Sequence, residues 1–109
     1  MTQIEIDNML DEMVRKIIEQ FHPDKIILFG SYARNEYTED SDFDILVVMP
    51  AENSQRQKAN EIDLALADRT VPMDLIVVTP EQFDRQKVLI GTIVYHAARE
   101  GRVIYERVA

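Results

Sequence analysis

The chain has 109 residues and no cysteine, which excludes disulfide bonds and cysteine-ligated zinc. Its formal net charge is −8, and the basic residues are scattered, which argues against a domain that binds duplex nucleic acid by itself. No apolar stretch approaches the roughly 20 residues that span a bilayer, and the N-terminal residues do not form a signal peptide. We therefore expect a cytoplasmic protein that does not enter membranes and folds as a single domain over residues 1–109.

The first part of the chain predicts a helix, a strand and a second, short helix. Apolar residues recur at helical spacing over residues 4–20, which predicts an amphipathic helix. The apolar run at residues 25–29 (KIILF) predicts a buried strand. Gly30-Ser31 breaks this run and opens a short helix around residues 31–36, followed by a polar and acidic loop.

Strands and helices continue to alternate in the middle of the chain. Residues 43–49 (FDILVVM) predict a second strand, which Pro50 stops. A helix is expected over residues 54–66, and residues 73–78 (MDLIVV) predict a third strand. This alternation is typical of an α/β domain in which helices pack on a small sheet.

The last part of the chain is predicted to be mainly helical. Thr79 is expected to cap a helix that has Pro80 in its first turn. The helical segment that follows ends near Gly101, and a small strand is expected over residues 103–105. The apolar residues of this helical segment are Val88, Ile90, Val94 and Ala97.

Two carboxylates begin the second predicted strand. Asp42 and Asp44 are two residues apart, so their side chains project from the same face of the strand. Two neighbouring carboxylates repel each other, and a divalent cation with a preference for oxygen ligands, such as Mg²⁺, resolves that repulsion. On the third strand, Asp74 occupies an unusual place for a carboxylate in an apolar run, and it can join the same cluster if the two strands are neighbours. Three such carboxylates can hold two Mg²⁺ ions for phosphoryl transfer.

The turn after the first strand has the features of a phosphate-binding site. Gly30 lets the backbone approach a phosphate closely, and the helix that follows offers free N–H groups at its positive end. The Ser31 hydroxyl adds a donor, and Arg34 lies one turn further along, within reach of the same phosphates.

These motifs together resemble the nucleotidyltransferase superfamily typified by the palm of DNA polymerase beta. The resemblance consists of a Gly-Ser turn, an Asp-x-Asp pair on a strand and a third Asp on a later strand. In this sequence the motifs stand at residues 30–34 (GSYAR), 41–48 (SDFDILVV) and 73–76 (MDLI). So short a chain is most similar to the minimal nucleotidyltransferase (MNT) group, the antitoxin halves of HEPN–MNT toxin–antitoxin pairs. The resemblance implies a mixed sheet with the metal site at one end.

The resemblance also implies a reaction and a partner. We expect an enzyme that transfers AMP from ATP to a protein hydroxyl, most readily a tyrosine, with Asp42, Asp44 and Asp74 as catalytic and metal-binding residues. Gly30, Ser31 and Arg34 would bind the nucleotide. The partner would be a HEPN-type toxin held in a hetero-oligomer, contacted through the N-terminal helix or the segment 88–98. One departure stands at Asn35, where family members often have glycine; asparagine tolerates a left-handed conformation, so the turn is expected to persist.

Two other hypotheses come from different functional classes. In the first, the domain neutralises a toxin by covering it, and catalysis is dispensable or lost. In the second, the chain modifies a small molecule, as antibiotic nucleotidyltransferases do, although such enzymes usually need a further domain for the acceptor.

Overall fold

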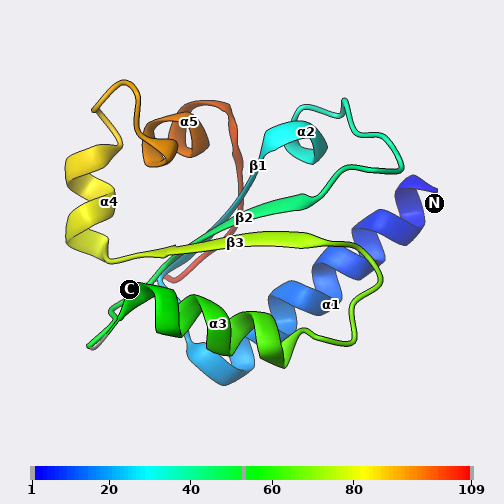
Figure 1. Ribbon diagram of the computed structural model, residues 1–109, viewed down its shortest axis with the longest axis horizontal. Helices are drawn as coiled ribbons and strands as arrows, with labels where there is room; N and C mark the ends of the chain where they lie inside the picture. The colour runs from blue at the N-terminus through cyan, green and yellow to red at the C-terminus, as the bar shows by residue number, and fades with distance from the viewer. Residues whose placement is uncertain (1, 53, 109) are drawn as a thin grey trace.

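The computed structural model describes residues 2–52 and 54–108, which form helices packed around one sheet (Figure 1). The elements in chain order are α1 (Gln3–Phe21), β1 (Lys25–Phe29), α2 (Gly30–Ala33), β2 (Phe43–Val48), α3 (Gln55–Ala65), β3 (Met73–Val78), α4 (Pro80–Gln86), α5 (Ile93–Glu100) and β4 (Arg102–Glu106). None of the described helices is long and apolar enough to cross a membrane. The predicted α/β class is confirmed.

The sheet is mixed, with its four strands in the order β3-β2-β1-β4. β1 pairs in antiparallel fashion with both β2 and β4, whereas β2 and β3 are parallel. The antiparallel pairing brings the end of β1 beside the start of β2, and the parallel pairing brings the start of β3 to the same place. The second and third predicted strands are therefore neighbours.

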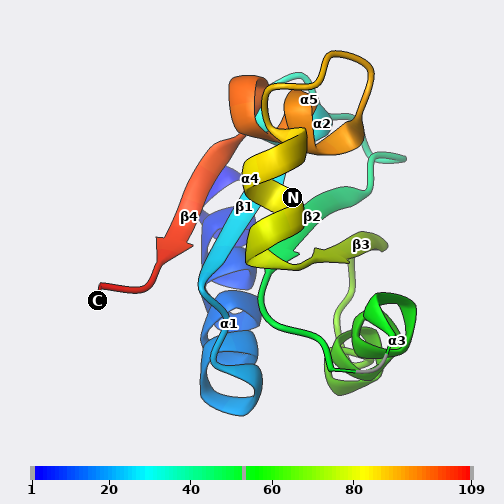
Figure 2. The same ribbon diagram turned by 90° about the vertical axis from the view of Figure 1, so that its left-hand side faces the viewer.

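Helices cover the two faces of the sheet unequally (Figures 1 and 2). On one face, α1 and α3 pack against the sheet (Figures 1 and 2), and four apolar residues of α1 are buried there and at most 6% exposed; these are Ile6, Leu10, Met13 and Ile17. On the other face, α4 and α5 cover a smaller cluster that includes Leu46, Phe83 and Val94. Short α2 lies at one end of the sheet, beside α5. The second face is therefore covered over only part of its length.

Side-chain caps fix where the helices begin. The Ser54 hydroxyl accepts a hydrogen bond from the backbone N–H of Gln57 at the start of α3. Thr79 caps α4 in the same way, with Pro80 at the first helical position. Such caps satisfy N–H groups that have no partner inside the helix. The predicted cap and first residue of α4 are confirmed, and α3 begins one residue after the predicted start at Ser54.

The last predicted helical segment was wrong between Lys87 and Thr92. The structure has two helices there, because Thr92 caps α5 and the preceding Gly91 has a φ of +96°. Val88 and Ile90 are 69% and 82% exposed in the connection, so they do not belong to a packed helix face. Only the part of the prediction that contains Val94 and Ala97, both buried in α5, is confirmed.

Gly101 marks the end of α5 for a reason other than the expected one. Its φ is −81°, so it is not the left-handed residue that often ends a helix. A Cβ atom at this position would lie 2.4 Å from the Ala97 carbonyl oxygen and 2.7 Å from Cγ2 of Ile27. Glycine is needed here because atoms of α5 and β1 lie too close to the Gly101 backbone to leave space for a side chain.

Candidate active site

The parallel pairing of β2 and β3 places two of the predicted carboxylates side by side. Asp44 is directly opposite Asp74 in the register of the two strands, which are spaced about 5 Å apart. Side chains alternate along a strand, so both carboxylates share the face on which Leu46 and Ile76 pack under α4 and α5. They lie at the end of that face which α4 and α5 leave uncovered (Figure 1).

The environment of Asp44 disfavours its charged form. Burial raises the pKa of Asp44, and the neighbouring charges of Asp74 and Asp42 raise it further, while Arg34 acts in the opposite direction. Asp42 and Asp74 are exposed, whereas Asp44 is partly buried. All three predicted carboxylates are therefore close enough to interact electrostatically, and together they carry more negative charge than the single arginine compensates.

The Gly30 turn lies directly against the Asp44 side chain. Gly30 has a φ of +74°, and a Cβ atom on it would lie 2.1 Å from Oδ2 of Asp44. Only glycine combines this left-handed conformation with so close an approach. The turn predicted to hold phosphates is therefore adjacent to the carboxylates, at the place where β1 passes into α2.

The short helix after this turn ends sooner than predicted. It spans Gly30–Ala33, and Arg34 follows as its C-cap. Asn35 has a φ of +61°, and its N–H donates to the Tyr32 carbonyl oxygen at 3.3 Å. The expectation that asparagine would preserve the turn is confirmed, because asparagine adopts the left-handed conformation at lower cost than most residues.

The other two predicted nucleotide-binding residues lie on the same turn. Ser31 is half-buried, and its carbonyl oxygen accepts a hydrogen bond from Glu36 N–H at 2.9 Å. Arg34 is exposed, with Nε 3.4 Å from Oε2 of Glu36. This exposed ion pair is weak, so the guanidinium is free to exchange its partner for a phosphate.

An aromatic stack that sequence reasoning missed ties the loop before Asp42 to the rest of the domain. The rings of Tyr32 and Tyr37 are stacked with centroids 4.6 Å apart, and the ring of Phe43 lies 4.4 Å from Tyr32. The Tyr37 hydroxyl donates to Oε1 of Gln3 at 2.9 Å. Because Phe43 separates Asp42 from Asp44, this stack fixes the backbone that carries both carboxylates. The sequence signal that could have indicated this stack was a pair of tyrosines: Tyr32 directly follows Gly30-Ser31, and Tyr37 begins the polar loop.

The carboxylates suit a divalent cation, although their side chains are not closed around one point. Among residues 2–52 and 54–108, no three His, Cys, Asp or Glu side chains converge closely enough to form a ready metal site. The backbone register pairs Asp44 with Asp74, so two of the three carboxylates lie on neighbouring positions of the sheet. The repulsion that raises the pKa of Asp44 is the kind of strain that a bound cation relieves.

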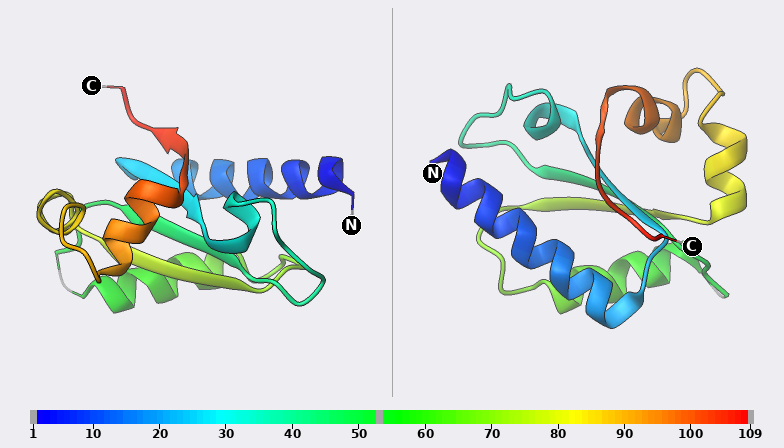
Figure 3. Two further views of the ribbon diagram at one scale, coloured as in Figure 1. Left: turned by 90° about the horizontal axis from the view of Figure 1, so that it is seen from above. Right: turned by 180° about the vertical axis from the view of Figure 1, so that it is seen from behind.

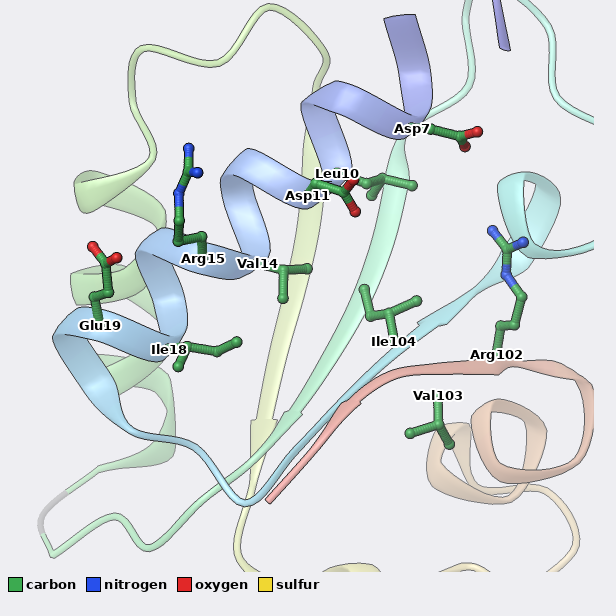
Figure 4. A pocket seen from close by; sticks show the side chains of 10 residues that line it. All are labelled: Asp7, Leu10, Asp11, Val14, Arg15, Ile18, Glu19, Arg102, Val103 and Ile104. Carbon is green, nitrogen blue, oxygen red and sulfur yellow. The ribbon is translucent and has the colours of Figure 1, made fainter. Parts of the chain in front are cut away.

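A hollow of about 680 Å³ lies elsewhere, between α1 and β4 (Figure 4). Leu10, Val14 and Ile18 of α1 face Ile104 of β4 across it. The hollow is on the α1 face of the sheet, opposite to the face that carries Asp44 and Asp74. It is therefore separate from the candidate active site.

The chain is similar in sequence to known proteins. Residues 10–98 match a family model described as a nucleotidyltransferase domain. "Putative protein adenylyltransferase MJ0604" of Methanocaldococcus jannaschii is 39% identical over 84 residues, which cover 74% of this chain and 77% of that protein. "Putative protein adenylyltransferase MJ1305" of the same organism is 41% identical over 109 residues, which cover 94% of this chain and 73% of that protein.

Solved structures share the fold at lower sequence identity. A structure described as "a putative nucleotidyltransferase from Sulfolobus solfataricus" has a TM-score of 0.67 and 22% identity, over 96% of this chain and 84% of that one. The toxin–antitoxin MntA-HpeT, in a form with two aspartate-to-glutamate substitutions, has a TM-score of 0.55 and 16% identity, over 89% of this chain and 73% of that one. The family match spans most of the chain and includes all of the site residues, so this protein belongs to the nucleotidyltransferase domain family.

Proposed function

We propose that this chain transfers AMP from ATP, with Mg²⁺, to a hydroxyl group of a partner protein, and so acts as the antitoxin of a toxin–antitoxin pair. The observation that carries the proposal is the position of Asp44, which lies opposite Asp74 and against the Gly30 turn. The names of the two Methanocaldococcus relatives support protein adenylylation. The toxin–antitoxin neighbours, one of them described with AMP-PNP, support the nucleotide and the partner.

Gly30 and Ser31 would hold the β- and γ-phosphates. The first N–H groups of α2 lack partners inside the helix and would donate to the phosphate oxygens. Arg34 would give up its exposed contact with Glu36 and add charge to the same phosphates. This placement leaves the α-phosphate beside Asp42 and Asp44.

Asp42, Asp44 and Asp74 would hold two Mg²⁺ ions, which would neutralise the charge of the triphosphate and of the departing pyrophosphate. The acceptor oxygen would attack the α-phosphorus while the bond to the bridging α–β oxygen breaks and pyrophosphate leaves. Asp74, exposed on the outer strand of the sheet, would face the acceptor and take the hydroxyl proton. Asp44, closer to the Gly30 turn, would face the nucleotide.

A tyrosine of a HEPN-type toxin is the acceptor we propose. A phenol has a pKa of about 10 and gives up its proton more readily than an aliphatic hydroxyl. The uncovered end of the sheet suits a side chain that arrives from another protein, because Asp74 is exposed there.

A second function, neutralisation of the toxin by binding alone, is favoured by one observation. The carboxylates are not closed around a metal-binding point among the described residues. In that case, a variant without the carboxylates would protect cells as well as the native protein does.

Intact-mass spectrometry of the partner tests the proposal. The chain and the product of its adjacent gene are purified together and incubated with ATP and Mg²⁺. We expect AMP units to be added to the partner, no addition with a chelator or with Asp42→Asn or Asp74→Asn, and slower addition with Ser31→Ala. Neutralisation by both the native chain and Asp42→Asn, with no mass added to the partner, would instead support the binding function.

A further inference from the structure

Tyr37 connects the first turn of α1 to the loop that leads to Asp42. Both views of Figure 3 show the start of α1 beside the loop between α2 and β2. The Tyr37 hydroxyl donates to Oε1 of Gln3 at 2.9 Å. Nε2 of Gln3 donates in turn to Oδ1 of Asp7 at 3.0 Å, one turn further along α1. Both ends of the Gln3 amide are thus engaged, which orients its oxygen toward Tyr37.

The ring of Tyr37 is held by aromatic contacts as well. It stacks on the Tyr32 ring with an interplanar angle of 11°. Tyr32 is 6% exposed and lies against Phe43, which is fully buried. Such aromatic pairs stabilise a structure beyond the apolar area that they bury. Tyr37 is therefore fixed at two points, by its hydroxyl to α1 and by its ring to α2.

The loop between Tyr37 and Asp42 is closed by its own hydrogen bonds. The Thr38 N–H donates to Oγ of Ser41 at 2.9 Å, and the Ser41 N–H donates to the Thr38 carbonyl oxygen at 3.1 Å. The Asp40 N–H donates to Oγ1 of Thr38 at 3.3 Å. Hydroxyl side chains that bind nearby backbone groups in this way stabilise a turn. A displacement of Tyr37 is therefore passed on to Asp42 rather than absorbed by the loop.

Asp42 differs from the other two carboxylates because it lies outside the sheet. Asp44 and Asp74 are paired residues of β2 and β3, so the strand pairing fixes their backbone. Asp42 precedes β2, so its position depends on the loop that leads to it. Burial raises the pKa of the Tyr32 hydroxyl, and Tyr37 and Asp42 raise it further, so Asp42 lies within electrostatic reach of the stack.

We infer that Tyr37 is a positioning residue that holds Asp42 in the carboxylate cluster, and that Gln3 of α1 holds Tyr37. This inference rests on the proposed function, because it takes the cluster to bind Mg²⁺ together with ATP. Residues that orient metal ligands commonly change metal affinity when they are replaced, although they do not touch the metal. The first turn of α1, which packs on the opposite face of the sheet, thereby takes part in metal binding.

Calorimetry of ATP binding to the purified chain, with Mg²⁺ and with a chelator, tests the inference. Tyr37→Ala removes the ring and the hydroxyl, and the gain in ATP affinity that Mg²⁺ provides should fall about tenfold or more. ATP affinity in the chelator should hardly change, because the Gly30 turn is still present. A general loss of folding would instead lower both affinities, and the melting temperature shows whether the variant is folded.

Two milder variants isolate the hydrogen bond. Tyr37→Phe keeps the stacked ring and loses only the hydroxyl, while Gln3→Ala removes the acceptor and leaves a good helix former on the surface. Each should reduce the gain from Mg²⁺ about two- to tenfold, the usual effect of one hydrogen bond. The double variant should reduce it no further than either single variant, because both changes remove the same bond.

Tyr105→Ala is the matched control. Tyr105, like Tyr37, is half-buried and packs against the larger apolar cluster. It lies on β4 opposite Ile26, three residues before the end of β1 that adjoins the carboxylates. Tyr105→Ala should lower the melting temperature and leave the gain from Mg²⁺ unchanged.

The outcomes distinguish this inference from the proposed function. A gain from Mg²⁺ in Tyr37→Ala within about twofold of the native value would overturn the positioning role, even if AMP is still added to the partner. An equal loss in Tyr105→Ala would also overturn it, because general destabilisation would then explain the effect. A loss confined to the variants of Tyr37 and Gln3, without AMP transfer by the native chain, would support positioning and contradict the proposed chemistry.

Discussion

The two faces of the sheet are built from the same strands but have different roles. Along β2, Phe43, Ile45 and Val47 point toward α1 and α3 and are at most 2% exposed. On the opposite face, Asp44 begins the strand and is only partly buried, while Leu46 and Val48 are covered by the second cluster. We call the first face the closed face, because α1 and α3 bury all three of these β2 side chains, although a hollow lies between α1 and the edge strand β4. The second is the open face, because it is uncovered at the end where the carboxylates lie.

The difference shows how a small domain can tolerate an electrostatically unfavourable site. The closed face supplies most of the buried apolar area, which provides the main driving force of folding. The repulsion among Asp42, Asp44 and Asp74 is confined to one end of the other face, partly in water. Stability and chemistry can therefore be changed separately, which the following predictions test.

The largest loss of stability is expected on the closed face. Ile17→Ala removes a side chain that is 2% exposed, and it should lower the free energy of unfolding by about 2–5 kcal/mol. Ile76→Ala makes the same chemical change on the open face, where the side chain is only partly buried, and should cost about 1–2 kcal/mol. Urea denaturation measures both, and equal losses would contradict the proposed difference between the faces.

The largest loss of nucleotide binding is expected at the junction of β1 and α2. Gly30→Ala places a Cβ atom 2.1 Å from Oδ2 of Asp44, so the carboxylate must move, and AMP transfer should fall about 100-fold. Gly91→Ala is the matched control: its φ is also positive, at +96°, but nothing lies within 4 Å of the added atom. Both variants should lose about 1 kcal/mol of stability from backbone strain. Gly30→Ala should lose more than this because of the clash with Asp44, and only this variant should weaken ATP binding in calorimetry.

A smaller effect on stability than that of the core substitutions is expected from removal of a charge at the open end. The folded-state pKa of Asp44 is raised, so the unfolded chain releases this proton at lower pH and the charge destabilises the native state at neutral pH. Asp44→Asn should therefore raise the melting temperature by a few degrees at pH 7 and leave it unchanged below the ordinary Asp pKa, while AMP transfer is lost. A large fall at pH 7 would show that Asp44 is structural.

Asp68→Asn is a control in which the melting temperature at pH 7 is expected to change in the opposite direction. A hydrogen bond from Lys16 lowers the pKa of Asp68, so its charge favours the native state above the ordinary Asp pKa, and this contribution is lost as the pH falls. The pair is exposed, so its removal should lower the melting temperature at pH 7 only slightly, if measurably.

Much of the fold follows from local patterns in the sequence. The strands predicted at residues 25–29 and 73–78 have the observed bounds, because continuous apolar runs with polar flanks mark buried strands. The spacing of Asp42 and Asp44 predicted that these two carboxylates share one face of a strand. The prediction that Asp74 joins them held only on the condition that the second and third strands are neighbours. That adjacency depends on the path of the chain through α3, which no local pattern specifies.

Other features depend on contacts between distant residues. The hydrogen bond from Tyr37 to Gln3 joins residues 34 positions apart. No local sequence pattern could therefore have predicted that these two residues are in contact. The exposed position of Val88 and Ile90 was missed because apolar residues near helical spacing normally predict a packed face. Gly91 followed by Thr92, a helix-breaking residue and a capping residue, was the local signal for two helices.

The two edges of the sheet differ in how well they resist aggregation. β4 has a bulge in its pairing with β1 and charged residues at both ends, Arg102 and Glu106, and such features discourage pairing with another molecule. β3 forms the other edge, and its sequence MDLIVV contains a single charge, that of Asp74. The carboxylate proposed to receive the acceptor proton is thus also the only charged side chain that guards this edge against strand addition. Substitutions that remove the charge of Asp74 would therefore both stop the proposed proton transfer and make the protein more prone to self-association.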